Sequence, residues 1–288
     1  MTQTTQSPPA SQGPLAPRLW AGLLLDRPRI MGIINVTPDS FSDGGVRLAP
    51  QAAIDAGFAM AAEGADIIDV GGESTRPGAP AVAPHDEQAR ILPVIRALAF
   101  AGLRVSVDTR HAATMAAALD AGAQIVNDVS GLTHDPHARA VVAARGCPVV
   151  LMHMRGTPDT MNALAVYDDV VRETKAELSA RLRAAAQAGI LAERIVIDPG
   201  IGFAKLAPHS TEMLRRLHEL RSLGHPILVG VSRKSFIGHL SGEPHPALRV
   251  GGSLAAGLFA VMRGASILRV HDVRETTQAL RVWHNLFA

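Results

Sequence analysis

The sequence has one cysteine, few aromatic residues and almost no excess charge. Cys147 can form neither an intrachain disulfide nor a thiolate metal site. Its place before Pro148 and an apolar run predicts a buried side chain and fits a reducing, cytoplasmic compartment. Only 3% of the residues are Phe, Trp or Tyr, too few for platforms that stack nucleic acid bases. The net charge of +2 also builds no field that would hold a nucleic acid.

The 288-residue chain also lacks a long apolar run, although 47% of it is hydrophobic. Because a membrane-spanning helix needs about 20 apolar residues, we expect no membrane partner. Residues 1–17 are rich in Thr, Gln, Ser and Pro, which predicts a disordered tail before a single domain over residues 18–288. The apolar run Leu19–Leu25 is expected to begin that domain as a strand.

From Ile30 onward, short apolar runs alternate with longer segments of helical spacing. Eight such runs are typical of strands buried on both faces: Ile30–Val36, Asp66–Gly71, Leu103–Val107, Gln124–Asn127, Pro148–Met152, Arg194–Asp198, Pro226–Gly230 and Ser266–Val270. Eight strand–helix units in about 260 residues predict an α/β fold of the (β/α)8 TIM barrel type. An open doubly wound sheet remains an alternative, because the spacing of strands and helices along the sequence does not show whether the sheet closes into a barrel. The longest helical segment, Asp168–Ala188, carries Glu173 and Glu177 on what we expect to be its outer side.

Polar residues follow all eight apolar runs, where a barrel builds its site. Asp108, Asn127 and Asp198 offer acceptors suited to a flat ring that carries several N–H donors. A cationic set suits a phosphate ester: Arg269, His271, Arg76 and Lys234, with Asn35 opposite. Any one of these residues could merely cap a helix or shape a turn. All eight exits together favour a functional site. Because no Cys or Ser nucleophile paired with a His is apparent, the two sets indicate group transfer with phosphate as the leaving group.

Two long loops rich in Gly and Ser follow the first two strands, at Thr37–Pro50 and Gly71–Asp86. Their length and composition are typical of active-site lids, with plain surface loops as the alternative.

Five segments resemble, in order, the motifs of the dihydropteroate synthase family: Met31–Gly45, Asp69–Gly78, Asp198–Phe203, Ser232–Ser235 and Arg269–Asp272. The resemblance extends from about Gly22 to the C-terminus. It implies condensation of 6-hydroxymethyl-7,8-dihydropterin diphosphate with 4-aminobenzoate to give 7,8-dihydropteroate and diphosphate, on the route to folate. Relatives usually have Thr at position 206 and Asn at position 210, where this chain has Leu206 and Ser210, which puts local loop details in doubt.

The resemblance also implies residue roles. Asn35 is expected to be the protein ligand for a Mg²⁺ cofactor, and Thr75 to touch the bound substrates. The pterin ring is expected to bind Asp108, Asn127 and Asp198, flanked by Met154 and Phe203. The diphosphate is expected to bind Arg269 and His271, with Arg76 and Val270 as further substrate contacts. The 4-aminobenzoate pocket, where sulfonamides compete, is expected to hold Phe41, Pro77, Ser232 and Arg233.

Lys234 receives two different assignments. Barrel geometry assigns it to phosphate, whereas the resemblance places it against the pterin ring, and we follow the resemblance. The expected catalytic set is then Lys234, Asp108, Asp198, Arg269 and His271. In the mechanism that the resemblance implies, diphosphate departs first, and the arylamine attacks a methylene cation delocalised into the pterin. Mg²⁺, Arg269 and His271 would stabilise the departing charge, and the two carboxylates the cation.

Two other functions share some of these features: a pterin-binding methyltransferase module, and a catalytically silent paralogue that binds pterin. The first has no need of the Ser74–Pro77 loop or the Ser232–Lys234 segment. Relatives are homodimers, and the apolar helix Leu254–Met262 could supply a dimer face or could equally be core.

Overall fold

The eight predicted strands close into a parallel barrel in the order β10-β3-β4-β5-β6-β7-β8-β9. The structure is a computed structural model that describes residues 18–37, 49–75, 78–79 and 81–287. Its barrel strands are β3 (Arg29–Asn35), β4 (Ile67–Gly71), β5 (Val105–Asp108), β6 (Ile125–Asp128), β7 (Val149–Met152), β8 (Ile195–Asp198), β9 (Ile227–Val229) and β10 (Ala265–Val270). Because β10 pairs with both β9 and β3, the sheet is closed, which confirms the TIM barrel and excludes the open sheet.

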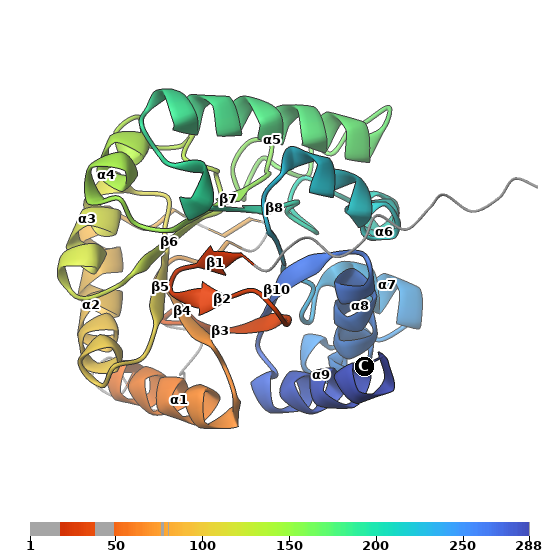
Figure 1. The fold of residues 1–288 in the computed structure, drawn as a ribbon, viewed down its shortest axis with the longest axis horizontal. Helices are drawn as coiled ribbons and strands as arrows, with labels where there is room; N and C mark the ends of the chain where they lie inside the picture. The colour runs from red at the N-terminus through yellow and green to blue at the C-terminus, as the bar shows by residue number, and fades with distance from the viewer. Residues whose placement is uncertain (1–17, 38–48, 76–77, 80, 288) are drawn as a thin grey trace, which may run out of the picture.

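Helices form a ring around the barrel (Figure 1). They are α1 (Ala49–Glu63), α2 (Pro84–Phe100), α3 (Ala112–Asp120), α4 (Ala138–Arg145), α5 (Val170–Gln187), α6 (Ala207–Arg215), α7 (Ser235–Ser241), α8 (Val250–Met262) and α9 (Val273–Phe287). Short 3-10 helices lie at η2 (Ala192–Arg194), η3 (Leu217–Leu223) and η4 (Pro246–Leu248). Among the described residues, no helix is both long enough and apolar enough to cross a membrane.

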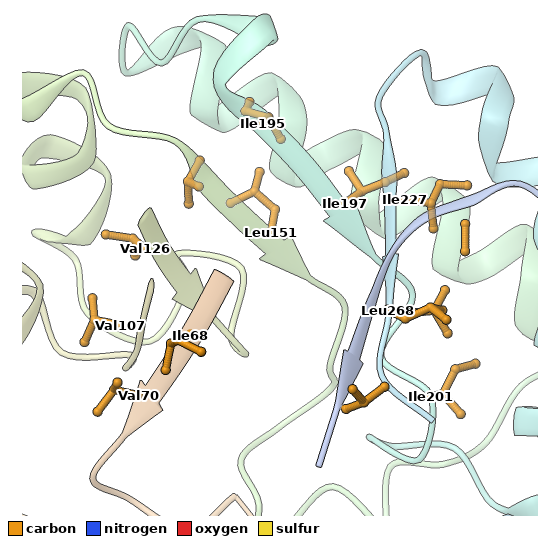
Figure 2. Close-up of a cluster of buried hydrophobic side chains, with 14 of the residues drawn as sticks. Ile68, Val70, Val107, Val126, Leu151, Ile195, Ile197, Ile201, Ile227 and Leu268 are labelled. Carbon is orange, nitrogen blue, oxygen red and sulfur yellow. The ribbon is translucent and has the colours of Figure 1, made fainter. Parts of the chain in front are cut away.

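The strands separate two apolar layers, because successive side chains of a strand point to opposite faces. The outward-facing side chains pack against the helices, and Figure 2 shows several of them, including Ile68, Val107 and Leu151. The inward-facing side chains near the strand starts fill the barrel interior: Met31, Ile67, Ile125, Val150, Val196, Leu228 and Ile267. The predicted burial of Cys147 is confirmed, since it belongs to the outer layer and is 8% exposed.

The run Leu19–Leu25 does not add a strand to the barrel. It forms a hairpin of two short antiparallel strands, β1 (Leu19–Trp20) and β2 (Leu23–Leu24), which Figure 1 shows in red across one end of the barrel. The Trp20 side chain enters the interior cluster at the strand starts, and its Nε1 donates to the Arg194 carbonyl at 2.9 Å. The hairpin therefore closes the end of the barrel where the strands begin. The predicted tail, residues 1–17, lies outside the described residues, as do parts of both predicted lid loops.

Replacing Trp20 by Ala should lower the free energy of unfolding by about 3–5 kcal/mol, because the change leaves a cavity where the Trp20 side chain closes the barrel interior. Leu19→Ala is the matched control on the same hairpin. Leu19 is 67% exposed, so the cost should stay within about 0.5 kcal/mol. Urea unfolding measures both variants, and equal losses would show that the Trp20 side chain does not plug the barrel.

Candidate active site

The inward-facing positions change from apolar to polar near the ends of the strands. Strand pairing aligns Asn35 with Gly71, Gly71 with Asp108, and Asp108 with Asn127 in one row across β3 to β6. On the far side of the barrel, Asp198 is aligned with Met152. The predicted polar residues on β3, β5, β6 and β8 thus share one end of the barrel.

Arg269 links the carboxylates at this end of the barrel, where the strands end, which we call the mouth. From its inward position on β10, its Nε donates to Asp69 Oδ2 and a terminal nitrogen donates to Asp108 Oδ2, each at 2.6 Å. Asn127 Nδ2 also donates to Asp69 Oδ2, at 2.9 Å. Burial opposes the charge of Arg269, but Asp69 and Asp108 hold its pKa above the ordinary value. The predicted phosphate ligand and the predicted pterin ligands therefore form one network here.

Asp69 is a member of this network that the sequence-based set omits. It is fully buried, and its Oδ1 has no hydrogen-bond partner among the described residues. An acidic residue inside an otherwise apolar strand, two positions before Gly71 and so on the same face, is the signal that could have revealed it. Burial raises the pKa of Asp108 to about 7, Arg269 opposes the rise, and the nearby Asp69 adds to it.

The other side of the mouth holds Asp198, Lys234 and Phe203. Asp198 accepts a hydrogen bond from the Gly200 amide at 2.7 Å, and Lys234 Nζ donates to the Ile201 carbonyl. The ammonium of Lys234 also lies 4.5 Å from the centre of the Phe203 ring. Burial lowers the pKa of Lys234 to about 8, with Asp198 opposing the shift. Burial likewise raises the pKa of Asp198, against the charge of Lys234.

Met154 and Phe203 lie in one apolar cluster beside these charges. The cluster consists of the buried side chains Val129, Met152, Met154, Met161 and Ala204, with Phe203 half-buried against them. It gives one wall of the mouth an apolar surface, as a flat ring would require.

Ser232, Arg233 and His271 lie together after β9 and β10. Ser232 Oγ accepts from the His271 amide at 3.2 Å and lies 3.1 Å from His271 Nδ1. Arg233 pairs with Asp272, with Nε 3.0 Å from Oδ2. The Val270 side chain packs in the outer apolar layer, so it points away from the mouth and only its backbone is placed to meet a ligand.

Asn35 and Thr75 are half-buried at the exits of β3 and β4. The remaining residues of the predicted set, Phe41, Arg76 and Pro77, lie outside the described residues. The loop after β4 begins at a buried ion pair that sequence reasoning missed. Arg110 Nε and a terminal nitrogen contact Glu73 at 3.0 and 2.8 Å, and Glu73 Oε1 also accepts from the Val82 amide at 3.0 Å.

Glu73, Glu87 and His111 have ligand atoms within 4.8 Å of one another. The ligand atoms of these three residues already make hydrogen bonds to one another or to neighbouring residues. Arg110 pairs with Glu73 through two hydrogen bonds, and Glu87 accepts from Thr109 at 2.9 Å and lies 3.1 Å from His111 Nδ1. A cation there would meet the Arg110 guanidinium, so the cluster acts as an anchor for the loop after β4.

The comparisons with known proteins agree on one family. The family described as pterin binding enzyme matches residues 31–271. Dihydropteroate synthase of Synechocystis sp. is 47% identical over 257 residues, which cover 89% of each chain. The solved dihydropteroate synthase of Xanthomonas albilineans with 4-aminobenzoic acid is 50% identical with a TM-score of 0.90, over 95% of this chain and 99% of that one. The Xanthomonas enzyme in complex with 7,8-dihydropteroate is 47% identical with a TM-score of 0.85, over 92% and 96% of the two chains.

The buried carboxyl group of Asp108 should make stability depend on pH. Its pKa is about 7 in the folded protein, against an ordinary value of 3.8, so between these values the folded state binds the extra proton. The contribution of Asp108 is then fully present below about pH 4 and is lost as the pH rises towards about 7.

The Asp108→Asn variant cannot titrate at this position and tests that contribution. Urea unfolding from pH 4 to 8 should show that the variant loses less stability than the unchanged protein across this range. Parallel profiles for the two proteins would exclude a raised pKa at Asp108.

Proposed function

The chain belongs to the dihydropteroate synthases of the pterin-binding enzyme family, and from this we propose how its barrel mouth joins a pterin diphosphate to 4-aminobenzoate. The observation that carries the proposal is the network of Asp69, Asp108 and Arg269 beside Asp198 and Lys234. It brings acceptors for a ring rich in N–H donors and cations for a diphosphate to one end of the barrel.

The pterin ring would lie in the mouth, with its N–H groups donating to Asp108, Asn127 and Asp198. Ionised carboxylates accept hydrogen bonds and cannot donate, so they select a ring edge that presents donors. Phe203 and Met154 would cover the ring from the apolar wall described above. The Xanthomonas enzyme bound to 7,8-dihydropteroate supports this ligand class for a chain of the same fold.

The reaction would begin with cleavage of the bond between the pterin methylene carbon and the diphosphate oxygen, and the bonding electrons would leave with the diphosphate. Arg269 and His271 would stabilise that charge, since preorganised cationic and N–H donors favour the transition state over the ground state. Ser232 can donate its hydroxyl proton to His271 Nδ1, which leaves Nε2 as the N–H donor.

Asp108 and Asp198 would stabilise the positive charge left on the ring and its methylene group. The arylamine nitrogen of 4-aminobenzoate then forms the new C–N bond with its lone pair and loses one proton to the diphosphate or to water. Ser232 and Arg233 would bind 4-aminobenzoate together with Phe41 and Pro77, and Arg76 and Thr75 would add contacts from the loop after β4. Lys234, between Asp198 and Phe203, would contact the pterin ring on this side.

The residues at the mouth fit a Mg²⁺ ion as the cofactor. Mg²⁺ takes oxygen ligands and keeps several waters, so one amide oxygen and the substrate phosphates can hold it. Asn35 supplies that oxygen in the row with Gly71 and Asp108. Gly71 leaves the intervening space open, because a Cβ there would lie 3.3 Å from Asp108 Cβ. Mg²⁺ bound there would neutralise charge on the diphosphate as it leaves.

Purified protein should release diphosphate only when 4-aminobenzoate, pterin diphosphate and Mg²⁺ are all present. Lys234→Ala, and Arg269→Ala combined with His271→Ala, should each lower kcat by on the order of 10²-fold, because they remove donors of the transition state. Arg145→Ala, a surface arginine paired with Asp120, is the control and should retain full activity. No release with all three present would contradict the proposal and favour a silent pterin-binding protein, and release that 4-aminobenzoate does not accelerate would contradict its role as the second substrate.

We also propose that the protein is a cytoplasmic homodimer that uses the face formed by α7, α8 and α9. Five large apolar side chains of this region are more than half exposed: Leu240, Leu248, Met262, Val282 and Leu286. Five further large apolar residues of α8 are half-buried: Val250, Leu254, Leu258, Phe259 and Val261. Exposed apolar side chains on neighbouring helices are typical of an interface.

Light scattering after size-exclusion chromatography should give the mass of a dimer for the unchanged protein. Combining Met262→Glu with Val282→Glu should shift it towards the monomer, because charges would then face each other across an apolar contact. Phe100→Glu, at a residue that is 97% exposed on α2, is the control and should remain dimeric. A monomeric unchanged protein would overturn this proposal.

A further inference from the structure

Two buried polar residues, Lys205 and His153, take no part in the chemistry described above. Lys205 Nζ lies 2.7 Å from His153 Nδ1, and His153 Nε2 lies 2.9 Å from Glu177 Oε2. Lys205 is 4% exposed and His153 is fully buried. Glu177, expected on the outer side of its helix, instead faces the end of β7 together with Glu173, since both contact Arg155.

The protonation of His153 follows from its two partners. Glu177 is an ionised carboxylate that only accepts hydrogen bonds, so Nε2 carries the proton that it donates to Glu177, and Nδ1 of the neutral ring then accepts from Lys205 Nζ. Burial lowers the pKa of His153 to about 3, and the charge of Lys205 adds to this effect. The imidazole is therefore neutral, and its acceptor nitrogen points at Lys205.

Lys205 contacts the segment that forms one wall of the mouth. Its Nζ lies 3.3 Å from the carbonyl oxygen of Phe203, whose ring lies under Lys234. Ser210 Oγ donates to the Lys205 carbonyl at 3.3 Å and accepts from the Gly202 amide at 3.2 Å. Hydrogen bonds at both its middle and its end therefore hold the segment 200–205.

His153 joins the same segment to the barrel. Its amide donates to the Asp198 carbonyl at 2.9 Å, and the chain then crosses directly over the His153 carbonyl at Gly200. A Cβ on Gly200 would come within 2.0 Å of that oxygen, and φ there is +67°, so only glycine fits. The position of the Phe203 ring is thus set by contacts that converge on His153 and Lys205.

The geometry points to Lys205, held by His153, as a positioning residue that fixes the Asp198–Phe203 segment and so sets affinity for the pterin substrate. This inference rests on the proposed function. Burial lowers the pKa of Lys205, and the negative charge of Asp198 opposes this shift. Neither Lys205 nor His153 needs to touch the reacting atoms, since they act through the Phe203 carbonyl and the path of the chain after Asp198.

Steady-state kinetics of the full chain tests the inference, with unfolding temperature as the measure of folding. Lys205→Met keeps the aliphatic length and removes the donor, so we expect KM for the pterin diphosphate to rise about tenfold or more, which corresponds to one hydrogen bond to a charged group. KM for 4-aminobenzoate should stay within about twofold. Trp20→Leu is the control for a general loss of stability and should change neither KM.

Two variants of His153 distinguish the loss of the hydrogen bond that orients Lys205 from a loss of core packing. His153→Asn places an amide oxygen where Nδ1 lies, so it keeps the acceptor for Lys205 and should retain KM for the pterin close to the original value. His153→Leu removes the acceptor and should behave like Lys205→Met. This pair decides the question if Lys205→Met does not fold.

Three results would overturn the inference: an unchanged pterin KM in folded Lys205→Met, equal increases in both KM values, or His153→Asn as impaired as His153→Leu. Failure of the proposed function looks different, because the unchanged protein would then form no product. Isothermal titration with the pterin diphosphate alone gives the corresponding dissociation constants and should show the same order among the variants.

Discussion

The architecture of the mouth depends on balancing charges that water cannot reach. An unpaired ion in a protein interior costs several kcal/mol even after relaxation. Asp69 is fully buried, and Asp108 is 8% exposed. Arg269 offsets both through hydrogen bonds of 2.6 Å, and Lys234 offsets the charge of Asp198 on the other side of the mouth. The balance is incomplete, because the pKa of Asp108 remains near 7 and one oxygen of Asp69 has no partner among the described residues. A ligand that donates N–H groups would complete it.

Because successive side chains of a strand point to opposite faces, these charged residues enter the barrel interior without disturbing the apolar packing on the outer face. The same inward face that holds Ile125 and Val196 near the strand starts holds Asn127 and Asp198 two residues later. The outward face is largely apolar, with the buried Asp128 at the end of β6 as an exception, and it packs the strands against the helices. Because the strands are rigid and the Trp20 hairpin closes the opposite end, the polar side chains are held before any ligand arrives. Preorganisation of this kind is what stabilises charge developing in a transition state.

The sequence predicted the barrel and its mouth well, since buried parallel strands and the polar residues that end them are local patterns. The extents of β7 and β8 differ from the predicted runs by one residue. What it could not predict are contacts between distant segments. Arg269 and Asp69 are 200 residues apart, and nothing near either one indicates that they pair. Glu177 looked solvated because its helix is charged, and only the fold shows His153 beneath it. The Leu19–Leu25 run was predicted to be one strand, but it forms two short strands because the chain turns at Ala21 and Gly22, where φ is positive, and its length does not distinguish a strand from such a hairpin.

Arg269 also explains why binding and chemistry share one network instead of two separate sites. With Nε on Asp69 and one terminal nitrogen on Asp108, its remaining terminal nitrogen makes no hydrogen bond to any residue that the structure describes. On the proposed mechanism, the pterin supplies donors to Asp108 and so shares the carboxylate with Arg269. The guanidinium would then interact more strongly with the diphosphate, which is the group that gains charge as the bond breaks. The same carboxylate would meanwhile face the ring that becomes positive. A single arginine between two acidic residues thus couples recognition of one end of the substrate to departure of the other, which two isolated pockets could not do.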